Sequence, residues 1–245
     1  MASNDEQHYK NILGNTLQAL KKYKKILFLT TSSRWHGEEG GEKPKSTQLA
    51  YKIAQRLKNS NISIIEVPLL NIYPCEGNVS TKRGNTCGEF EAKKKDPLKN
   101  PSGSHRCWAS VNNKDDELWQ ISKELFESDC VVFFGSVRWG QMNSIYQKLI
   151  ERLTWIENRH TTLGEDNIVE NIDAGIIIVS QNWNSAQVLD IQKQVLRFFG
   201  FNVTDDLCWN WQYSKDETDE SEESYKDAVS RFAKIFLEED RKNFN

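Results

Sequence analysis

The chain has 245 residues, of which 38% are hydrophobic and 27% are charged. With glycine added, the apolar share lies just under the roughly 45–50% that is usual for globular proteins, which excludes a disordered chain. The 32 basic and 35 acidic side chains give a net charge of -3, so we expect no nucleic-acid partner. The longest uncharged apolar runs, residues 131–137 and 174–179, are far shorter than the ~20 residues of a membrane-spanning helix, so we expect no membrane partner.

The chain begins with a helical pattern over residues 4–22, which predicts an N-terminal helical extension, residues 1–24. From residue 25 onward, apolar runs of β-capable residues alternate with helical periodicities. The expected order is strand 25–31, helix 46–57, strand 61–70, helix 115–126, strand 130–135, helix 142–156, strand 174–180, helix 186–199, a weaker strand at 201–203 with Leu207, and helix 225–237. The strand runs lack period-2 alternation, as is typical of strands buried on both faces. Because parallel strands need crossover connections, this order predicts an α/β fold with a doubly wound parallel sheet in one domain, residues 25–245.

Two segments stand out from this alternation. Residues 74–114 lack periodicity and carry eight basic against four acidic side chains, which predicts a long loop insertion that serves as a lid or a partner surface. Residues 205–223 carry eight acidic side chains and one lysine, which predicts a solvated loop. In the helix over 186–199, the residues expected to face inward are Val188, Ile191, Val195 and Phe198.

Ligands of open α/β sheets bind beyond the carboxyl ends of the strands, so the loops after three strands are candidate binding loops. The first offers hydroxyls, free backbone N–H groups and a helix N-terminus, which together favour a phosphate. Its candidate residues are Thr31, Ser32, Ser33, Arg34, Ser46 and Thr47. We expect the last two to cap the helix. The loop has neither a Walker pattern nor a Gly-x-Gly-x-x-Gly pattern, and its alternative interpretation is an ordinary polar turn.

The second and third loops offer a different chemistry. The candidate residues of the second loop are Ser136, Val137, Arg138, Trp139, Gly140 and Gln141. An arginine, a tryptophan and a glycine at the end of a buried strand suit a flat conjugated ring that needs stacking and edge hydrogen bonds. The candidate residues of the third loop are Ser180, Gln181 and Asn182. Each loop carries one tryptophan, Trp35, Trp139 or Trp183, and scattered core aromatics are the alternative interpretation.

The order of these loops resembles the flavodoxin-like flavoproteins, specifically the family of NADPH-dependent FMN reductases and NAD(P)H quinone reductases. Residues 31–34, followed after an insertion by residues 46–47, are similar to the family's phosphate loop. Residues 136–143 are similar to the loop that holds the isoalloxazine ring, with Val137 where the family usually has proline. The third loop lacks the family's Gly-Gly pair.

The resemblance implies a flavodoxin-like three-layer sandwich whose five-stranded parallel sheet has the order 2-1-3-4-5. It implies an FMN-dependent NAD(P)H oxidoreductase that passes electrons from a nicotinamide through bound FMN to a quinone, a flavin or a similar small acceptor. Hydride transfer at the flavin requires no protein acid or base, so no catalytic residue is named beyond Arg138, which is expected to stabilise negative charge near the reduced flavin. The resemblance also implies a homodimer. The acceptor and the choice between NADH and NADPH stay open.

Alternatives come from other classes. One is a non-catalytic FMN electron carrier that acts on a protein partner through residues 74–114, and another is a scaffold without flavin. Iron–sulfur flavoproteins resemble this fold, but Cys75, Cys87 and Cys107 lie 12 and 20 positions apart, so we expect no metal. No cysteine is followed by arginine six positions later, which excludes a tyrosine-phosphatase loop.

The remaining expectations concern the compartment and the histidines. The N-terminal residues have neither the basic start nor the apolar stretch of a secretory signal, and we expect a cytoplasmic protein. Five cysteines at irregular spacings predict reduced thiols. His105, like His36, is expected in a solvent-facing polar turn.

Overall fold

The computed structural model describes residues 4–34, 41–57, 61–219 and 221–238. Its centre is a sheet of five parallel strands in the order β2-β1-β3-β5-β6. The strands are β1 (Lys25–Thr30), β2 (Asn61–Glu66), β3 (Cys130–Arg138), β5 (Asp173–Ser180) and β6 (Asn202–Gln212), and the two-residue β4 (Gln141–Met142) pairs antiparallel with the end of β3. Counted in chain order, the parallel strands have the predicted order 2-1-3-4-5, which is therefore confirmed.

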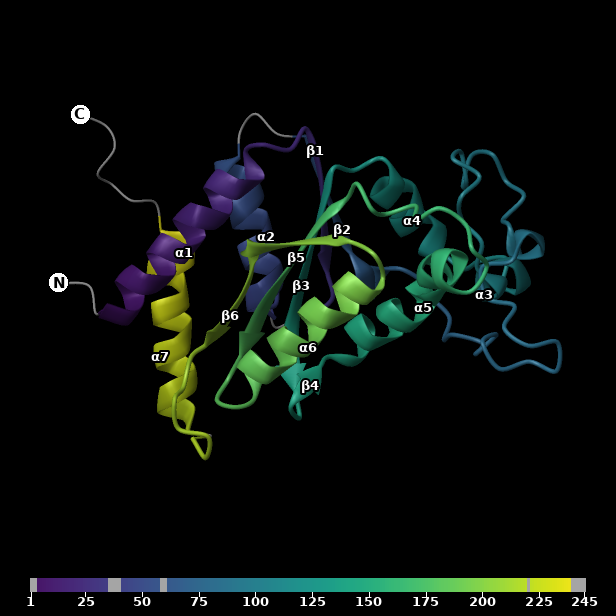
Figure 1. The fold of residues 1–245 in the computed structure, drawn as a ribbon. Helices are drawn as coiled ribbons and strands as arrows, with labels where there is room; N and C mark the ends of the chain where they lie inside the picture. The colour runs from purple at the N-terminus through teal and green to yellow at the C-terminus, as the bar shows by residue number, and fades with distance from the viewer. Residues whose placement is uncertain (1–3, 35–40, 58–60, 220, 239–245) are drawn as a thin grey trace.

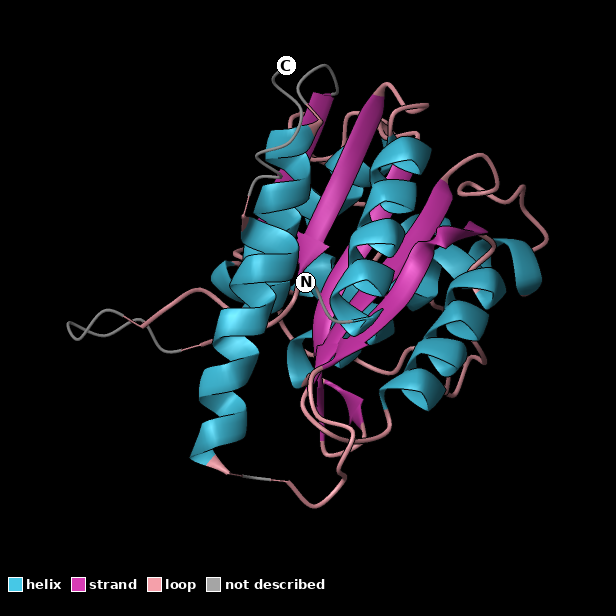
Figure 2. Ribbon diagram, turned by 90° about the vertical axis from the view of Figure 1, so that its left-hand side faces the viewer, coloured by secondary structure: helices cyan, strands magenta, loops and turns pink. Residues whose placement is uncertain are grey.

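The sheet lies between two helical layers (Figures 1 and 2). One layer contains α1 (Asn4–Leu20), α2 (Lys45–Arg56), α7 (Glu222–Phe232) and the π-helical turn η3 (Ala233–Leu237). The other contains α4 (Leu118–Phe126), α5 (Ser144–Thr161) and α6 (Ser185–Phe198). The short elements are the 3-10 turns η1 (Val67–Leu69) and η2 (Phe90–Ala92) and the helix α3 (Trp108–Asn112). The three-layer α/β sandwich with an additional N-terminal helix is confirmed, while the domain boundary at residue 24 stays a prediction.

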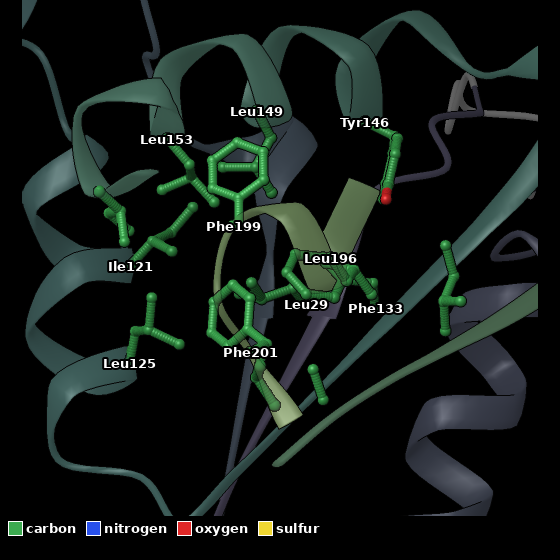
Figure 3. Packing of buried hydrophobic residues seen from close by; sticks show 14 of the residues in the cluster. Leu29, Ile121, Leu125, Phe133, Tyr146, Leu149, Leu153, Leu196, Phe199 and Phe201 are labelled. Atoms are coloured by element: carbon green, nitrogen blue, oxygen red, sulfur yellow. The ribbon is translucent and has the colours of Figure 1, made fainter. Parts of the chain in front are cut away.

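The inner strands are buried on both faces because each side of the sheet is covered by helices. Successive side chains of a strand point to opposite faces, so Phe28 packs in the α1/α2/α7 layer while Leu29 packs in the other. Figure 3 shows Leu29 and Phe133 on the side of the sheet that faces α4 and α5, in one cluster with Leu149 and Tyr146. This two-sided burial explains why the strand sequences lack a polar face.

The inward face of α6 differs from the prediction. Ile191 is 51% exposed and Phe198 is 71% exposed. The buried residues are Ser185, Val188, Leu189, Gln192 and Leu196. The apolar periodicity of the sequence fits two neighbouring stripes of this helix, because residues 188–191–195–198 and 189–192–196 both have helical spacing. The second stripe packs against the sheet together with Val188 and the partly buried Val195, so the inward positions expected for these two valines are confirmed and those of Ile191 and Phe198 are wrong.

The acidic segment after residue 204 also differs from the prediction. Strand β6 continues to Gln212, so Asp205 and Asp206 belong to a strand rather than to a solvated loop. Its pairing with β5 shifts register between Ala174 and Ile176. The two aspartates lie in this irregular stretch of an edge strand, where Lys193 contacts the carboxylate of Asp205 at 2.7 Å. A count of acidic residues could not distinguish an edge strand with a bulge from a loop.

The insertion, residues 74–114, is an ordered unit that contains η2, α3 and a bridge between Lys93 and Arg106. Figure 1 shows α3 beyond α4 and α5, on the side of the molecule away from α1 and α7. The expectation for His105 is wrong, since it is 1% exposed and its Nδ1 lies 2.7 Å from Ser122 Oγ, beside the ring of Trp155. Burial lowers the pKa of His105 to about 3, so the ring is neutral there.

Candidate functional site

Two adjoining pockets lie at the carboxyl ends of the strands. The polar pocket is lined by Ser32, Ser33, Arg34, Pro44, Lys45, Ser46, Ser136, Val137, Arg138, Val179, Ser180, Gln181, Tyr213 and Tyr225. The aromatic pocket is lined by Val137, Arg138, Trp139, Gly140, Gln181, Asn182, Trp183, Glu217 and Tyr225. The two share Val137, Arg138, Gln181 and Tyr225, so we treat them as one cleft with a polar and an aromatic end. Its position is where ligands bind in open α/β sheets.

Twelve of the fifteen residues proposed from the sequence line this cleft. The exceptions are Thr31, Thr47 and Gln141. Thr31 is buried and donates its hydroxyl to the carbonyl of Phe134 at 3.0 Å. Thr47 is buried within α2, and Gln141 is exposed on β4. No residue of the insertion is among the described residues that line either pocket, so the cleft has no lid from that segment there. Trp35 and His36 lie outside the described residues.

A chain of serine hydroxyls forms the floor of the polar end. Ser46 Oγ donates to Ser32 Oγ at 2.8 Å, and Ser32 Oγ donates to Ser136 Oγ at 3.0 Å. These serines come from the start of α2, the end of β1 and the end of β3. Ser180 Oγ, at the end of β5, is buried and has no hydrogen-bond partner in the described chain. A buried hydroxyl without a partner is costly, which makes it a candidate to bind a ligand.

The N-terminus of α2 is a second feature that favours a ligand at the polar end. The prediction that Ser46 and Thr47 cap this helix is wrong. Pro44 occupies the N-cap position and no side chain caps the helix. Ser46 and Thr47 lie inside the first turn, and the hydroxyl of Thr47 has no partner in the described chain. The first backbone N–H groups of a helix have no intrahelical partner, and together with the helix dipole they favour an anion.

Three cations converge on the cleft: Arg34, Lys45 and Arg138. Within the described part of the chain, none of them forms an ion pair with a carboxylate, whereas most of the other arginines of that part do. Burial, followed by the nearby charge of Arg34, lowers the pKa of Lys45. Burial, followed by the neighbouring Tyr225, raises the pKa of Tyr213, so a neutral phenol lies beside these cations.

The aromatic end is built by a tight turn between β3 and β4. Trp139 and Gly140 have φ angles of 49° and 69°, and positive φ at both central residues is what a type I′ hairpin turn requires. Asn184 Nδ2 donates to the carbonyl of Gly140 at 2.9 Å, and a Cβ at Gly140 would lie 2.8 Å from the ring of Trp183. Glycine is therefore required there for close packing of the second loop on the third. Trp139 is 94% exposed and Trp183 is 46% exposed at the rim.

Sequence reasoning missed several lining residues, chiefly Lys45, Tyr213, Glu217 and Tyr225. Lys45 directly precedes a named serine, so a search for cations at the helix start could have found it. Tyr213 directly follows β6, Tyr225 lies in the first turn of α7, and Glu217 lies in the segment between these two elements. No pattern in the sequence indicated that this acidic segment folds back to the cleft.

Neither a metal cluster nor a membrane span is found in the part of the chain that the structure describes. Those residues contain no group of three or more His, Cys, Asp or Glu side chains suited to a metal ion. None of the described helices is both long and apolar enough to cross a bilayer.

The sequence matches no family model and no curated protein. Solved structures match in fold. One is RosB with the bound intermediate 8-demethyl-8-formylriboflavin-5'-phosphate, at a TM-score of 0.55 and 13% identity over 86% of this chain and 74% of that chain. Another is the azoreductase AzrA, at a TM-score of 0.53 and 14% identity over 86% of this chain and 98% of that chain. The resemblance found in the sequence is therefore confirmed at the level of the fold, and this chain has the flavodoxin-like α/β fold.

Proposed function

We propose that this protein is an FMN-dependent NAD(P)H oxidoreductase that passes electrons from a nicotinamide through bound FMN to a quinone, a flavin or a similar small acceptor. The observation that carries the proposal is the cleft itself. At one end, three cations that pair with no carboxylate of the described residues lie near an uncapped helix N-terminus, and two exposed tryptophans flank the other end. A charged, hydroxyl-lined end joined to an aromatic end suits a ligand with a phosphate at one end and a flat ring at the other.

The polar end fits the phosphate of FMN by the kind of donor it offers. Ser32 and Ser46 supply hydroxyls, Ser180 supplies a hydroxyl with no other partner in the described chain, and Lys45 supplies charge at the first turn of α2. Hydrogen bonds between such cations and phosphate oxygens are among the strong ones in proteins. Binding the phosphate dianion would also favour the protonated form of Lys45, whose pKa is lowered by burial.

The aromatic end fits a conjugated ring. Bound FMN supplies hydride transfer, a chemistry that no amino-acid side chain provides. Arg138 lies where the two pockets meet, so its charge would stabilise negative charge on a ring bound there. Trp139 and Trp183 supply stacking surface, and Gly140 keeps the second loop close to the third. The residues of the cleft thus bind and orient, while none is needed as an acid or a base.

The fold neighbours support a flavin, since one is named with a riboflavin-5'-phosphate derivative bound and the other is named an azoreductase. The proposal includes a cytoplasmic location and a homodimer. Support for the dimer comes from the apolar side chains of Ile191 and Phe198 that α6 leaves exposed. Light scattering at micromolar concentration tests it, and a mass near 28 kDa, that of one chain, would remove it.

The first experiment is a visible absorption spectrum of the purified protein before and after addition of FMN, and then with NADPH and with NADH under anaerobic conditions. We expect retained flavin whose bands bleach with at least one nicotinamide. Flavin that binds without bleaching would instead favour the electron carrier, and a protein that retains no FMN would overturn the proposal. Lys45→Met should bind FMN about 10–100-fold more weakly, while the matched control Lys226→Met, on the exposed face of α7, should bind it as the unmodified protein does.

A further inference from the structure

The segment that follows β6, residues 213–219, is bound to the third loop, and we call it the strap. Ser214 N donates to the carbonyl of Gln181 at 2.8 Å, and Gln181 Nε2 donates to the carbonyl of Asp219 at 3.0 Å. Asn182 Nδ2 donates to the carbonyl of Glu217 at 2.9 Å. These bonds hold the strap against one wall of the cleft.

Two of the strap's three carboxylates are engaged in its own folding. Asp219 accepts hydrogen bonds from Ser224 and from the backbone and hydroxyl of Ser221, which lower its pKa to about 2. Asp216 accepts from the backbone N–H and the hydroxyl of Thr218 at 2.9 and 2.7 Å. Both carboxylates therefore fix the shape of the strap.

Glu217 is the exception. Its side chain accepts no hydrogen bond and forms no ion pair with any described residue, and it lines the aromatic end of the cleft. Among the described residues that line either pocket, it is the one that carries a carboxylate. Its backbone carbonyl accepts a hydrogen bond from Asn182, so the strap holds the backbone of Glu217 at the aromatic end while its carboxylate is exposed.

The sum of charges shows what Glu217 does. Arg34, Lys45 and Arg138 bring three positive charges to the cleft, and a bound phosphate monoester removes nearly two of them. With Glu217 ionised, the described lining of the loaded cleft is close to neutral. Without it, one positive charge would remain to attract an anion. Glu217 thus lowers the net charge of the described lining by one.

We propose that Glu217 is a specificity-determining residue that discriminates against anionic acceptors, so that the second substrate of the cleft is a planar aromatic compound without negative charge. This inference rests on the proposed function. In water, two unit charges about 6 Å apart interact by an amount that corresponds to about a threefold change in rate or affinity. The effect is screened by salt, because the Debye length is about 8 Å at 0.15 M ionic strength.

The kinetic test compares two acceptors that share one ring system, 9,10-anthraquinone-2-sulfonate and the uncharged 2-hydroxymethyl-9,10-anthraquinone. The quantity measured is the ratio of kcat/KM for the sulfonate to that for the uncharged compound, at low salt. We expect Glu217→Gln to raise this ratio about threefold and Glu217→Lys about ninefold, with both increases reduced at 0.5 M salt. The control is Glu222→Gln, which removes the same charge from the exposed first turn of α7, where Glu222 pairs with Lys226.

An unchanged ratio in both Glu217 variants, or an equal rise in Glu222→Gln, would overturn the inference. A second measurement needs no turnover: quenching of tryptophan fluorescence by each anthraquinone gives its Kd, with Trp139 and Trp183 at the binding end. The sulfonate should bind about threefold more tightly to Glu217→Gln than to the unmodified protein, and the uncharged compound equally to both. If NADPH bleaches the flavin but these ratios do not move, this inference alone fails. If no flavin is retained, the proposed function fails, and the fluorescence ratios still test Glu217.

Discussion

Arg138 in the cleft and Arg152 beneath the insertion differ in whether the guanidinium group is buried and whether it has a carboxylate partner. The guanidinium of Arg152 is fully buried and donates to both carboxylate oxygens of Asp116, at 2.7 and 3.0 Å, and to the carbonyl of Tyr73. Burial acts to raise the pKa of Asp116, but hydrogen bonds from Arg152 and Ser110 outweigh it and lower the pKa. Arg138, by contrast, is exposed and has no carboxylate partner in the described chain.

The contrast corrects an inference from composition. The excess of basic residues in the insertion suggested a charged functional surface, yet Arg83 pairs with Glu89, Arg106 pairs with Glu165, and Lys94 Nζ donates to the carbonyl of Ser110. Several of its charges therefore hold the insertion together and to the segment that follows α5. The cleft has fewer cations, and none of them pairs with a carboxylate among the residues that the structure describes. For locating a ligand site, the presence of cations without carboxylate partners is therefore more informative than a large number of basic residues.

The largest expected effect comes from breaking the buried pair. Arg152→Leu leaves the Asp116 carboxylate buried without its partner, and we expect the free energy of unfolding to fall by about 3–5 kcal/mol. Urea denaturation followed by circular dichroism measures it. The control Lys226→Ala removes the exposed pair with Glu222 and should cost no more than about 1 kcal/mol. Equal losses in the two variants would show that the buried pair has no special role in stability.

Removing a cation from the cleft should change the free energy of unfolding little and weaken FMN binding strongly. Lys45→Met should weaken FMN binding about 10–100-fold, because a charged hydrogen bond contributes about 1.5–3 kcal/mol. Flavin fluorescence quenching measures the Kd. Unchanged affinity would place the phosphate elsewhere.

The lowered pKa of Lys45 also sets a sign for the pH dependence of stability. The folded protein releases this proton at a lower pH than the unfolded chain, so the unfolded chain binds more protons between the lowered pKa and 10.5. The contribution of Lys45 to the free energy of unfolding therefore rises as the pH is raised through that window. The rise should be absent in Lys45→Met, and its persistence would contradict the assignment.

His105 offers a smaller test in the insertion. Its pKa of about 3 lies below the ordinary value of 6.5, so the unfolded chain binds a proton that the folded protein does not. Stability should fall as the pH is lowered from 7.5 to 5, and this one group should account for about 2 kcal/mol. His105→Gln should lose that part of the pH dependence, while His8→Gln, at an exposed site in α1, should keep it. Identical pH profiles for both variants would contradict a neutral, buried His105.

The sequence was most informative where burial is two-sided and least informative at the edges of the sheet. Runs such as Ile26–Leu29 and Val131–Phe134 predict their strands because helices cover both faces. Strand β6 was expected only at residues 201–203 and Leu207, because an edge strand can carry Asp205 and Asp206 without burying them. The faces of α6 were misassigned because Ile191 and Phe198 have the same spacing as the buried stripe.

The residues of the candidate site likewise fall into a group that the sequence pattern predicts and a group that it does not. Strand ends carry Ser32, Ser136 and Ser180 to one edge because parallel strands end together, and that placement follows from the sequence pattern. Tyr213 and Tyr225 reach the cleft through hydrogen bonds between the strap and the third loop, which are contacts between distant segments. Local patterns contain no information about such contacts.

Trp139 gives the smallest effect and the sharpest separation of stability from binding. An exposed tryptophan at φ 49° gains little from packing and pays for a left-handed backbone, which asparagine adopts more readily. Trp139→Asn creates the Asn-Gly pair favoured in type I′ turns, so the free energy of unfolding should rise by about 0.5–1 kcal/mol. The same change removes a stacking surface and should weaken FMN binding about 3–10-fold. Trp139→Phe keeps both the ring and the strain, and should change neither quantity much. A Trp139→Asn variant that is less stable and binds flavin normally would mean that the tryptophan belongs to the scaffold, as Arg152 does, and not to the ligand site.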